Sequence, residues 1–320
     1  MILAIGNSGV YEMKAYQAVF AALERYGKTA KLFKQDKCLQ GEYLHFEIIG
    51  GKAKYSVIID GQVYDLGQFS AIWYMKPHLP RELLNYNPVE HRQFIDRQFH
   101  VLRQAIWNLC RDKKWLNDPW AIQMAESKIY QLEVAIRNGF KVPETCITSD
   151  PEKVKRFYQE HSGKIIVKLL AVSPMLNQVI YTNKVTAKQM QDIDSVKMSP
   201  SIFQEIVPKA YELRITVVGD KIFAVKIHSQ QDEETSLDWR RKPKLNDFDV
   251  KMEPITLPSN IEWQIYGYMQ ALNLQFGCID MIVTPDGDYI FLEINPNGQW
   301  YFVQLKTELQ IAQAIAELLI

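Results

Sequence analysis

The hydrophobic positions of the chain follow strand-like and helix-like periods in alternation, separated by turn residues. A buried-strand pattern at residues 2–5 (ILAI) leads through the turn Gly6-Asn7-Ser8-Gly9 into a helical pattern over residues 11–25. Residues 88–116 also have helical spacing, which predicts one long helix. Between them, the segments with strand composition and glycine punctuation are KTAKLF, YLHFEIIGG, KYSVIIDG, QVYDL and SAIWYMKP. This pattern predicts an α/β domain over residues 1–117.

A second unit is expected over residues 118–198. It begins with a helical stretch from Ala121 to Asn138 and includes a second helix over residues 151–161. Its strand patterns are VPETCIT and KIIVKLL. Residues 171–182 predict a loop or hairpin. These short elements predict a small α/β unit.

A third unit is expected over residues 199–320, where strand patterns dominate. The strands SIFQEIV, ELRITVVG and KIFAVKIH are followed by a charged loop over residues 229–249 and a helix over residues 261–272. The segment FGCIDMIVTPDGDYIFLEINP has two alternating runs joined by Pro285-Asp286-Gly287, which predicts a β-hairpin. The third unit is therefore expected to be built on an antiparallel sheet.

Composition and charge restrict the possible functions. Of the 320 residues, 47% are hydrophobic and 23% charged, as in ordinary globular proteins. Lys and Arg together number 37, as do Asp and Glu, so a basic surface for nucleic acid is not expected. The four cysteines lack zinc or disulfide-framework spacing and are interpreted as reduced core residues. The N-terminus has no signal-peptide pattern and no long apolar run occurs, so we expect a cytoplasmic protein without a membrane partner.

Oxygen-bearing side chains gather at the end of the predicted hairpin. Asp280 closes the first strand, and Glu293 and Asn295 lie two residues apart at the end of the second strand. Because side chains alternate along a strand, all three can point to one face, and such oxygen donors suit Mg²⁺ bridging nucleotide phosphates. A polar turn that merely ends the strand is the alternative interpretation, and spacing alone does not decide between the two.

The segment L-E-I-N-P-N-G, preceded by an acidic residue at the end of the neighbouring strand, resembles the metal-binding signature of ATP-grasp ligases. This resemblance implies an ATP-grasp fold, with an N-terminal α/β domain, a central small α/β domain and a C-terminal antiparallel-sheet domain. It also implies ATP and Mg²⁺ as cofactors, with Asp280, Glu293 and Asn295 as metal ligands. Lys128, near a helix start, and Lys168, at the end of a strand, are similar to the family's phosphate-binding lysines. Taken alone, each lysine would be interpreted as a solvated surface residue.

Further positions match the same family. The run FQEIVPKAYELRITVVG resembles the segment around the bound nucleotide, with adenine contacts near its start and a ribose contact further along. The resemblance implies nucleotide contacts at Glu205, Ile206, Val207, Glu212 and Asn295. Arg214 and Arg240, the latter in a D-W-R segment, resemble the arginines that stabilise the transferring phosphoryl group. Arg214 alone would be interpreted as a surface sheet residue, and His161 and His228 do not indicate a nucleophile–base pair.

Within this superfamily the chain resembles the peptide-maturing ligases of microviridin and related graspetide pathways, which are related to RimK-type glutamate ligases. SAIWYMKP is similar to a strand end in their N-terminal domain, and NPNGQW extends the metal-binding signature. The resemblance implies a precursor peptide as partner, with a leader helix and an acidic core closed into ester or amide cross-links through acyl phosphates. It also implies a homodimer. Departures from the family pattern, which leave the substrate open, occur at Met75-Lys76, Gln304, Glu308 and Gln310.

Two other functions would use the same nucleotide-binding residues. A RimK-like ligase would join amino acids to a protein or to a small-molecule carboxylate, and the N-terminal domain would distinguish it. A nucleotide- or precursor-binding module without catalysis would have lost a magnesium carboxylate or Arg214, whereas the sequence keeps them. The precursor, the bond type and the number and order of rings are not fixed by a likeness of fold.

Overall fold

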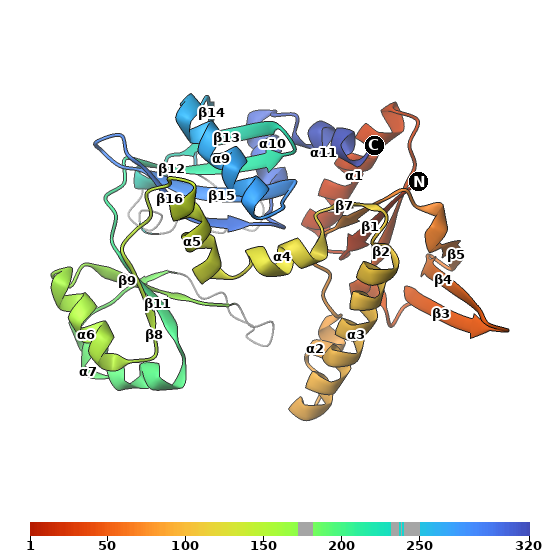
Figure 1. Ribbon diagram of the computed structural model, residues 1–320, viewed down its shortest axis with the longest axis horizontal. Helices are drawn as coiled ribbons and strands as arrows, with labels where there is room; N and C mark the ends of the chain where they lie inside the picture. Colours follow the sequence, from red (N-terminus) through yellow and green to blue (C-terminus); the bar gives the residue numbers. More distant parts are fainter. Residues whose placement is uncertain (172–181, 232–236, 238, 240–249) are drawn as a thin grey trace. The chain divides into compact units, whose positions relative to one another are not determined.

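The computed structural model describes residues 1–171, 182–231, 237, 239 and 250–320. The chain divides into two compact units (Figure 1). Unit 1 consists of Met1–Ile122, Asn273–Phe276 and Gln299–Ile320, and unit 2 consists of Gln123–Leu272 and Gly277–Gly298. Most of the predicted loops at 171–182 and 229–249 lie outside the described residues. The three-part division into residues 1–117, 118–198 and 199–320 stays a prediction.

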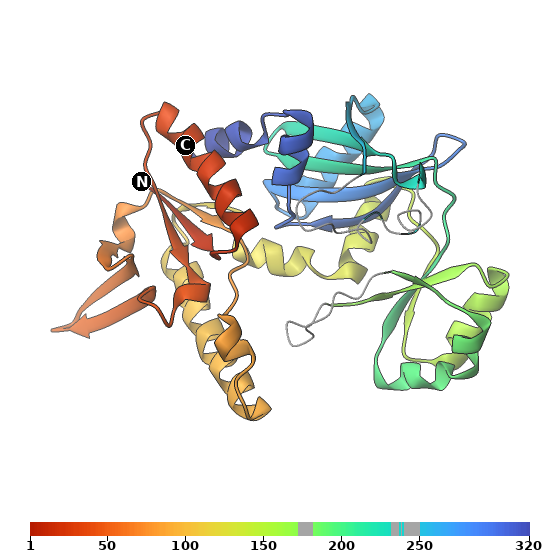
Figure 2. The ribbon, with the colours of Figure 1, turned by 180° about the vertical axis from the view of Figure 1, so that it is seen from behind.

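Unit 1 is built on a sheet of parallel strands in the order β2-β1-β6-β7. These strands are β1 (Ile2–Gly6), β2 (Ala30–Lys34), β6 (Ala71–Tyr74) and β7 (Lys114–Leu116). Every residue of β1 is buried, as expected of an apolar strand inside a parallel sheet. Helix α1 (Val10–Arg25) follows β1, which confirms the predicted strand–turn–helix opening. Helix α11 (Ile311–Leu319) packs against α1 (Figure 2).

An antiparallel sheet and further helices complete unit 1. The remaining elements are β3 (Tyr43–Ile49), β4 (Lys52–Ile59), β5 (Gln62–Asp65), α2 (Arg81–Leu84), α3 (Val89–Leu109), α10 (Tyr301–Thr307) and the 3-10 helices η1 (Gln35–Lys37) and η2 (Leu66–Gln68). Strands β3, β4 and β5 pair in that order. Apolar side chains of the parallel sheet, such as Leu3 and Ile72, form one core cluster with Ile106 and Trp107 of α3.

The single helix predicted over residues 88–116 is wrong at its C-terminal end. Helix α3 ends at Leu109, and the chain turns and adds β7 to the edge of the sheet. The turn is closed by Trp115, whose Nε1 donates to the Cys110 carbonyl at 2.8 Å. Apolar residues on both sides of the turn fit a helical period, so periodicity alone joined two elements.

Unit 2 contains a first sheet in the order β10-β9-β11-β8, with antiparallel neighbours. Its strands are β8 (Thr145–Thr148), β9 (Ile165–Leu169), β10 (Asn183–Lys184) and β11 (Ser201–Glu205). The helices of this part are α6 (Pro151–Glu160), α7 (Ala187–Gln191) and the 3-10 helix η3 (Ile193–Met198). Val154 and Phe157 of α6 share a core cluster with Ile165 and Phe203 of the sheet.

A second sheet of unit 2 has the order β14-β13-β12-β15-β16. Its strands are β12 (Tyr211–Val218), β13 (Lys221–Ile227), β14 (Met252–Ile255), β15 (Phe276–Val283) and β16 (Tyr289–Asn295), with η4 (Ser229–Gln231) after β13 and helix α9 (Ser259–Ala271) after β14. Gly287 has a φ of 87° in the turn between β15 and β16, and its N–H donates to the Thr284 carbonyl at 3.0 Å. The predicted hairpin is confirmed.

The helical stretch predicted from Ala121 to Asn138 is two helices, α4 (Pro119–Ala125) and α5 (Lys128–Arg137). Ser127 separates them because it caps α5, and its side chain accepts a hydrogen bond from the Tyr130 N–H. The break places Lys128 in the first turn of α5. The prediction of one continuous helix is therefore wrong at this point.

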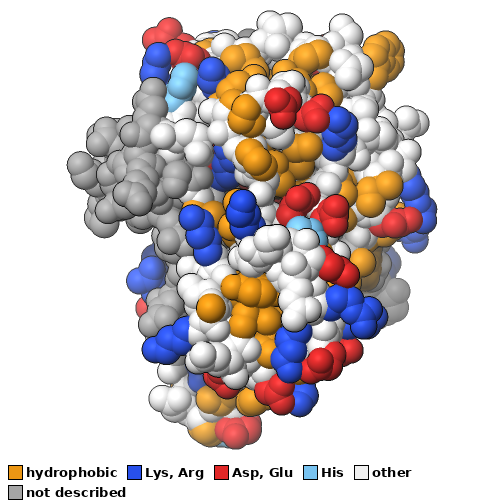
Figure 3. Space-filling model, turned by 90° about the vertical axis from the view of Figure 1, so that its left-hand side faces the viewer, with side chains coloured by type: hydrophobic (Ala, Val, Ile, Leu, Met, Phe, Trp, Pro, Cys, Tyr) orange, Lys and Arg blue, Asp and Glu red, His pale blue; other side chains and the backbone are white. Residues whose placement is uncertain are grey.

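The surface and the helices of the described residues show two further features. On the face drawn in Figure 3, acidic and basic side chains are interspersed with hydrophobic ones. Within the described ranges, no helix combines the length and the apolar character needed to cross a bilayer.

Candidate active site

Three candidate metal ligands lie on the β15–β16 hairpin. The prediction that Asp280 closes its strand is wrong, because β15 continues to Val283 and pairs with β16 beyond this residue. Asp280 and Glu293 stand directly opposite each other in the antiparallel register. The pairing shifts immediately after this position, where Leu292 is the extra residue of a β-bulge on β16. Because Asn295 is two residues beyond Glu293, it lies on the same face of the sheet. The structure therefore brings Asp280, Glu293 and Asn295 to one face, as their spacing predicts.

Arg214, on β12, is held against Asp280. Its Nη1 donates to both carboxylate oxygens of Asp280, at 3.0 Å each. The arginine is 6% exposed, so this ion pair is largely shielded from water. Burial alone would lower the pKa of the guanidinium, but Asp280 and, less strongly, Glu293 raise it, and the net shift is upward. A permanent positive charge is thus fixed beside two of the candidate metal ligands.

Lys128 occupies the corresponding position beside Glu293. Its Nζ donates to Glu293 Oε2 at 2.6 Å, and both side chains keep about a third of their surface exposed. The lysine reaches the carboxylate from the first turn of α5, where the Ser127 cap fixes the start of the helix. Each of the two carboxylates is therefore paired with one cation, Asp280 with Arg214 and Glu293 with Lys128.

The donor set fits a magnesium ion bound together with a phosphate. Two carboxylates placed opposite each other on neighbouring strands repel, and cations are needed to offset this repulsion. Mg²⁺ in nucleotide sites uses one or two carboxylates and completes its coordination with phosphate oxygens and water. Among the described residues, no group of three or more His, Cys, Asp or Glu side chains is arranged to hold a metal. A metal at Asp280 and Glu293 would complete its coordination with Asn295, phosphate oxygens and water.

Lys168 lies on the first sheet of unit 2. It lies one residue before the end of β9 at Leu169, and its Nζ donates to Gln204 Oε1 at 2.8 Å. Gln204, which is buried, in turn donates from Nε2 to Thr145 Oγ1 at 2.9 Å. The structure thus places Lys168 in a polar cluster that spans β9, β11 and β8.

The predicted adenine-facing segment follows β11. Glu205 is tied to Glu144 twice, because its backbone N–H donates to the Glu144 carbonyl at 3.1 Å and its Oε1 accepts from the Glu144 N–H at 2.9 Å. The Ile206 N–H donates to the Lys164 carbonyl at 3.0 Å. Within the described part of the chain, the backbone N–H and C=O of Val207 have no hydrogen-bond partner. A fixed segment with a free donor and a free acceptor suits the edge of a planar heterocycle.

Glu212, the predicted ribose contact, is buried in the second sheet. Its Oε1 accepts a hydrogen bond from Lys209 Nζ at 3.1 Å, and Lys209 also donates to the Leu237 carbonyl at 2.9 Å. Burial raises the pKa of the Glu212 carboxyl, and Lys209 and Ser229 offset that effect in part. The carboxylate therefore has ordered partners on the face that also carries Arg214.

The other predicted residues do not add to this cluster. Arg240 lies outside the described residues. His228 Nε2 lies 2.9 Å from Glu253 Oε2, and His161 Nδ1 lies 2.8 Å from the Phe157 carbonyl. Both histidines thus have local partners, and their interpretation as residues without a catalytic role stays a prediction.

Sequence reasoning missed Gly298, which lies beneath Arg214. Its N–H donates to the Asn295 carbonyl at 3.1 Å and closes the turn after β16. A Cβ built on Gly298 would lie 2.4 Å from Cys278 Cβ and 3.0 Å from Arg214 Nη2. A side chain at this position would therefore collide with the floor of the arginine site. The glycine in N-P-N-G was the available signal.

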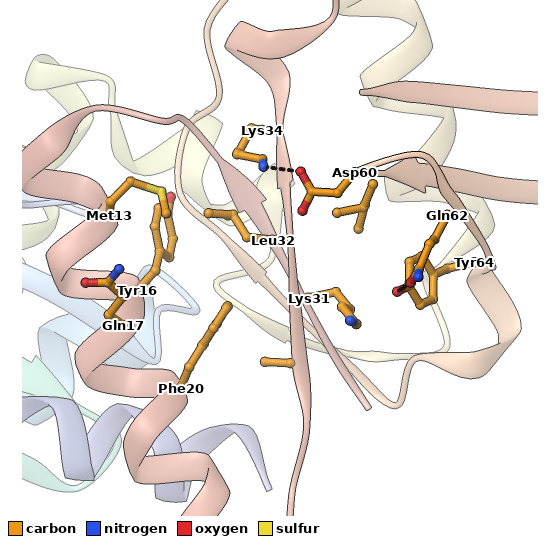
Figure 4. Close-up of a pocket in the computed structure, with 12 residues that line it drawn as sticks. Met13, Tyr16, Gln17, Phe20, Lys31, Leu32, Lys34, Asp60, Gln62 and Tyr64 are labelled. Carbon is orange, nitrogen blue, oxygen red and sulfur yellow. Dashed lines mark hydrogen bonds and ion pairs between the residues drawn. The ribbon is translucent and has the colours of Figure 1, made fainter. Parts of the chain in front are cut away.

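Unit 1 has a cavity of about 340 Å³ between α1, β2 and the β4–β5 hairpin (Figure 4). Lys34 reaches it from β2 and donates to Asp60 at 2.8 Å, while Glu42 also lies 3.2 Å from the same Nζ. Lys31 Nζ lies 5.2 Å from the ring centroid of Tyr64. The charges of Lys34, Asp60 and Glu42 at this cavity are therefore paired within unit 1.

Comparison with known proteins identifies the family. Residues 125–319 match the model of the RimK-like ATP-grasp domain. A comparison with curated protein sequences gives no match. Among solved structures, the macrocyclase MdnC of Microcystis aeruginosa MRC, bound with precursor peptide MdnA, is 32% identical with a TM-score of 0.86, covering 100% of this chain and 99% of that chain.

Two more solved structures resemble the chain over nearly its whole length. A RiPP-associated ATP-grasp ligase of Chryseobacterium gregarium, in complex with ADP and a leader and core peptide, is 28% identical with a TM-score of 0.84, covering 99% of this chain and 96% of that chain. The macrocyclase MdnB of Microcystis aeruginosa MRC is 27% identical with a TM-score of 0.81, covering 100% of this chain and 98% of that chain. The predicted ATP-grasp fold is confirmed, and the chain belongs to the RimK-like ATP-grasp family of ligases.

Proposed function

We propose that this ligase uses ATP and Mg²⁺ to activate Asp or Glu side chains of a ribosomal precursor peptide as acyl phosphates, and closes them into macrocyclic esters or amides. The observation that carries the proposal is the carboxylate cluster of Asp280 and Glu293, paired with Arg214 and Lys128. It occurs in a chain aligned from end to end with a macrocyclase bound to its precursor peptide.

The nucleotide would be held by residues of both sheets of unit 2. The free backbone N–H and C=O of Val207 suit the adenine edge, next to Glu205 and Ile206, and Glu212 suits a ribose hydroxyl. Lys168 and Lys128 would contribute point charges for the phosphates. Asn295 is exposed at the end of β16, where its side chain can face a bound nucleotide.

Asp280, Glu293 and Asn295 would hold Mg²⁺ against the phosphates. When bound, the metal would supply Lewis-acid neutralisation of charge on the transferring phosphoryl group. Lys128 now neutralises Glu293, so nucleotide binding would redirect its Nζ from the carboxylate toward a phosphate. Before the nucleotide binds, each carboxylate is paired with one cation. After it binds, the metal would replace Lys128 as the partner of Glu293.

Arg214 would serve the reacting group. Its Nη1 is held by Asp280, and the buried guanidinium stays charged. Such a fixed fork stabilises negative charge that develops on a phosphoryl group and later on a tetrahedral intermediate. Arg240 is proposed as a second clamp on the same charge.

The proposed partner is a precursor peptide with a leader helix and an acidic core, bound at the central residues 118–198 by its leader.

We further propose a homodimer, with α3 as the contact. Glu90, Phe94, Arg97 and Val101 are exposed and lie at helical spacing on one face of α3, with Phe94 64% exposed. In antiparallel contact of two copies about Phe94, Glu90 of each copy would face Arg97 of the other. A charge swap, Glu90→Arg with Arg97→Glu, should restore a dimer that either single change weakens.

The test is incubation of the purified enzyme with Mg²⁺, ATP and a candidate precursor, a short peptide with acidic residues and Ser, Thr or Lys in its tail. Released phosphate and the mass of the peptide are measured together. The proposal predicts loss of one water per ring, coupled to phosphate release. Phosphate release with free amino acids and an unchanged peptide would instead support the RimK-like alternative. No turnover with any acceptor would leave a binding module.

A further inference from the structure

The buried amide of Gln131 is bonded to the metal-binding end of β16. Gln131 lies on α5 and is 1% exposed. Its Oε1 accepts from the Ile294 N–H at 3.1 Å, and its Nε2 donates to the Ile294 carbonyl at 3.0 Å. The same Nε2 donates to the Ala125 carbonyl at 2.5 Å. One side chain therefore joins the end of α4, the helix α5 and the strand β16.

The position of Ile294 gives these bonds their importance. Ile294 lies between Glu293 and Asn295, the two proposed ligands on β16. Strand β16 is the last strand of its sheet. On its outer edge Lys141 forms a single bridge with Ile290, and at Ile294, four residues further on, the partner is the Gln131 side chain. The Gln131 amide presents one donor and one acceptor to Ile294, as a residue of an adjacent strand would. Gln131 thus supplies the missing hydrogen-bond partners on the outer edge of β16, at the residue between Glu293 and Asn295.

The same helix carries Lys128, which binds Glu293 one turn before Gln131. Helix α5 thus holds the end of β16 in two ways, through a cation on the carboxylate and through an amide on the backbone beside it. The Ala125 bond also fixes the segment that leads into α5, just before the Ser127 cap. Any movement of β16 relative to α5 would therefore break the Gln131 bonds.

We propose that Gln131 is a positioning residue, which fixes the backbone at Ile294 so that Glu293 and Asn295 present their oxygens to the metal in a productive arrangement. This inference rests on the proposed magnesium site. Partners behind metal ligands orient them, and their loss typically lowers metal affinity about 10–100-fold. A purely structural amide would instead affect the stability of the fold without a selective effect on the metal.

The test measures ADP affinity by calorimetry, with and without Mg²⁺, in wild type, Gln131→Met and Gln131→Glu. Methionine has a similar shape but leaves Ile294 and Ala125 without their side-chain partner. Glutamate keeps an acceptor for the Ile294 N–H but places a carboxylate oxygen against the carbonyl oxygens of Ile294 and Ala125. Gln131→Glu is the second variant, used if Gln131→Met does not fold. The matched control is Gln35→Met, since Gln35 is also 1% exposed but lies in unit 1.

The inference predicts that Mg²⁺ strengthens ADP binding to the wild type and that this strengthening falls at least about tenfold in the Gln131 variants, with metal-free ADP affinity unchanged. The Gln35→Met chain should keep the wild-type response to Mg²⁺. Equal strengthening in folded Gln131 variants, or an equal loss with and without metal, would overturn the positioning role. A wild type that shows no effect of Mg²⁺ would refute the proposed metal site itself, which is a separate outcome.

Discussion

Replacing Gly298 by alanine should displace the turn after β16 and crowd the guanidinium of Arg214. The new Cβ would lie 2.4 Å from Cys278 Cβ, 2.7 Å from its Sγ and 3.0 Å from Arg214 Nη2, whereas ordinary contact begins at 3.4 Å. Cys278 is fully buried in β15 and cannot swing away. The contact with Cys278 Cβ falls about 1 Å short of ordinary contact and that with Arg214 Nη2 only about 0.4 Å, so the turn that carries Gly298 must move by about 1 Å to admit the methyl group.

The expected magnitude follows from this displacement. Overpacking a rigid core costs about 1–3 kcal/mol of unfolding free energy. A catalytic group misplaced by about 1 Å can lower turnover by about 100-fold. Urea unfolding measures the first quantity and phosphate release with a precursor peptide measures the second. The turnover loss should exceed what the unfolded fraction explains.

Two further variants make the prediction specific. Gly267→Ala is the matched control, because Gly267 lies in α9 and its Cβ would meet Asn138 Oδ1 at 2.7 Å and neither Cys278 nor Arg214. It should keep wild-type turnover. Cys278→Gly combined with Gly298→Ala removes the two shortest contacts and should regain turnover relative to Gly298→Ala alone. Wild-type turnover and stability in Gly298→Ala would refute the reasoning.

Three other changes have defined outcomes. Arg214→Met should lower the free energy of unfolding by about 3–5 kcal/mol in urea, because it leaves the Asp280 carboxylate without its buried partner. Adding Asp280→Leu should recover most of that loss. No recovery in the double variant would contradict the pairing. Lys251 and His228 lower the pKa of the Glu253 carboxyl to about 2. The stability that the ionised Glu253 contributes is therefore fully present above the ordinary glutamate pKa and is lost as pH falls toward 2. Glu253→Gln should therefore lower the thermal midpoint at pH 6 but not near pH 2, and an equal effect at both would contradict this. Glu308 follows the last residue of α10 and has a left-handed φ of 59°, a conformation that glycine adopts without strain. Glu308→Gly should therefore raise the free energy of unfolding by up to about 1 kcal/mol. A lower free energy of unfolding would contradict backbone strain at this residue.

Much of the fold could be predicted because local patterns and tertiary structure agree. The apolar run of β1, the helix after it and the Pro285-Asp286-Gly287 hairpin each have a signal within a few residues. The spacing of Glu293 and Asn295 likewise placed them on one face with Asp280. These signals need no knowledge of distant residues.

The remaining features depend on contacts that a linear pattern does not contain. The apolar period ran through Cys110 into β7, because Trp115 fits a helical face as well as a strand. Ser127 interrupted a helix that its neighbours favoured. Gln131 is an ordinary helix residue until β16 is placed beside it, 163 positions later in the chain. The departure at Glu308 was visible in sequence, but its left-handed conformation was not.

The most direct test of the central claim is trapping of the activated carboxylate with hydroxylamine. The enzyme is incubated with Mg²⁺, ATP, hydroxylamine and the precursor peptide, and the peptide and the nucleotide are analysed together. The account predicts hydroxamates on Asp or Glu side chains of the peptide core with release of ADP and phosphate, and no hydroxamate with Glu293→Ala. Release of AMP and pyrophosphate, or unmodified peptide in the presence of ATP turnover, would contradict activation through an acyl phosphate.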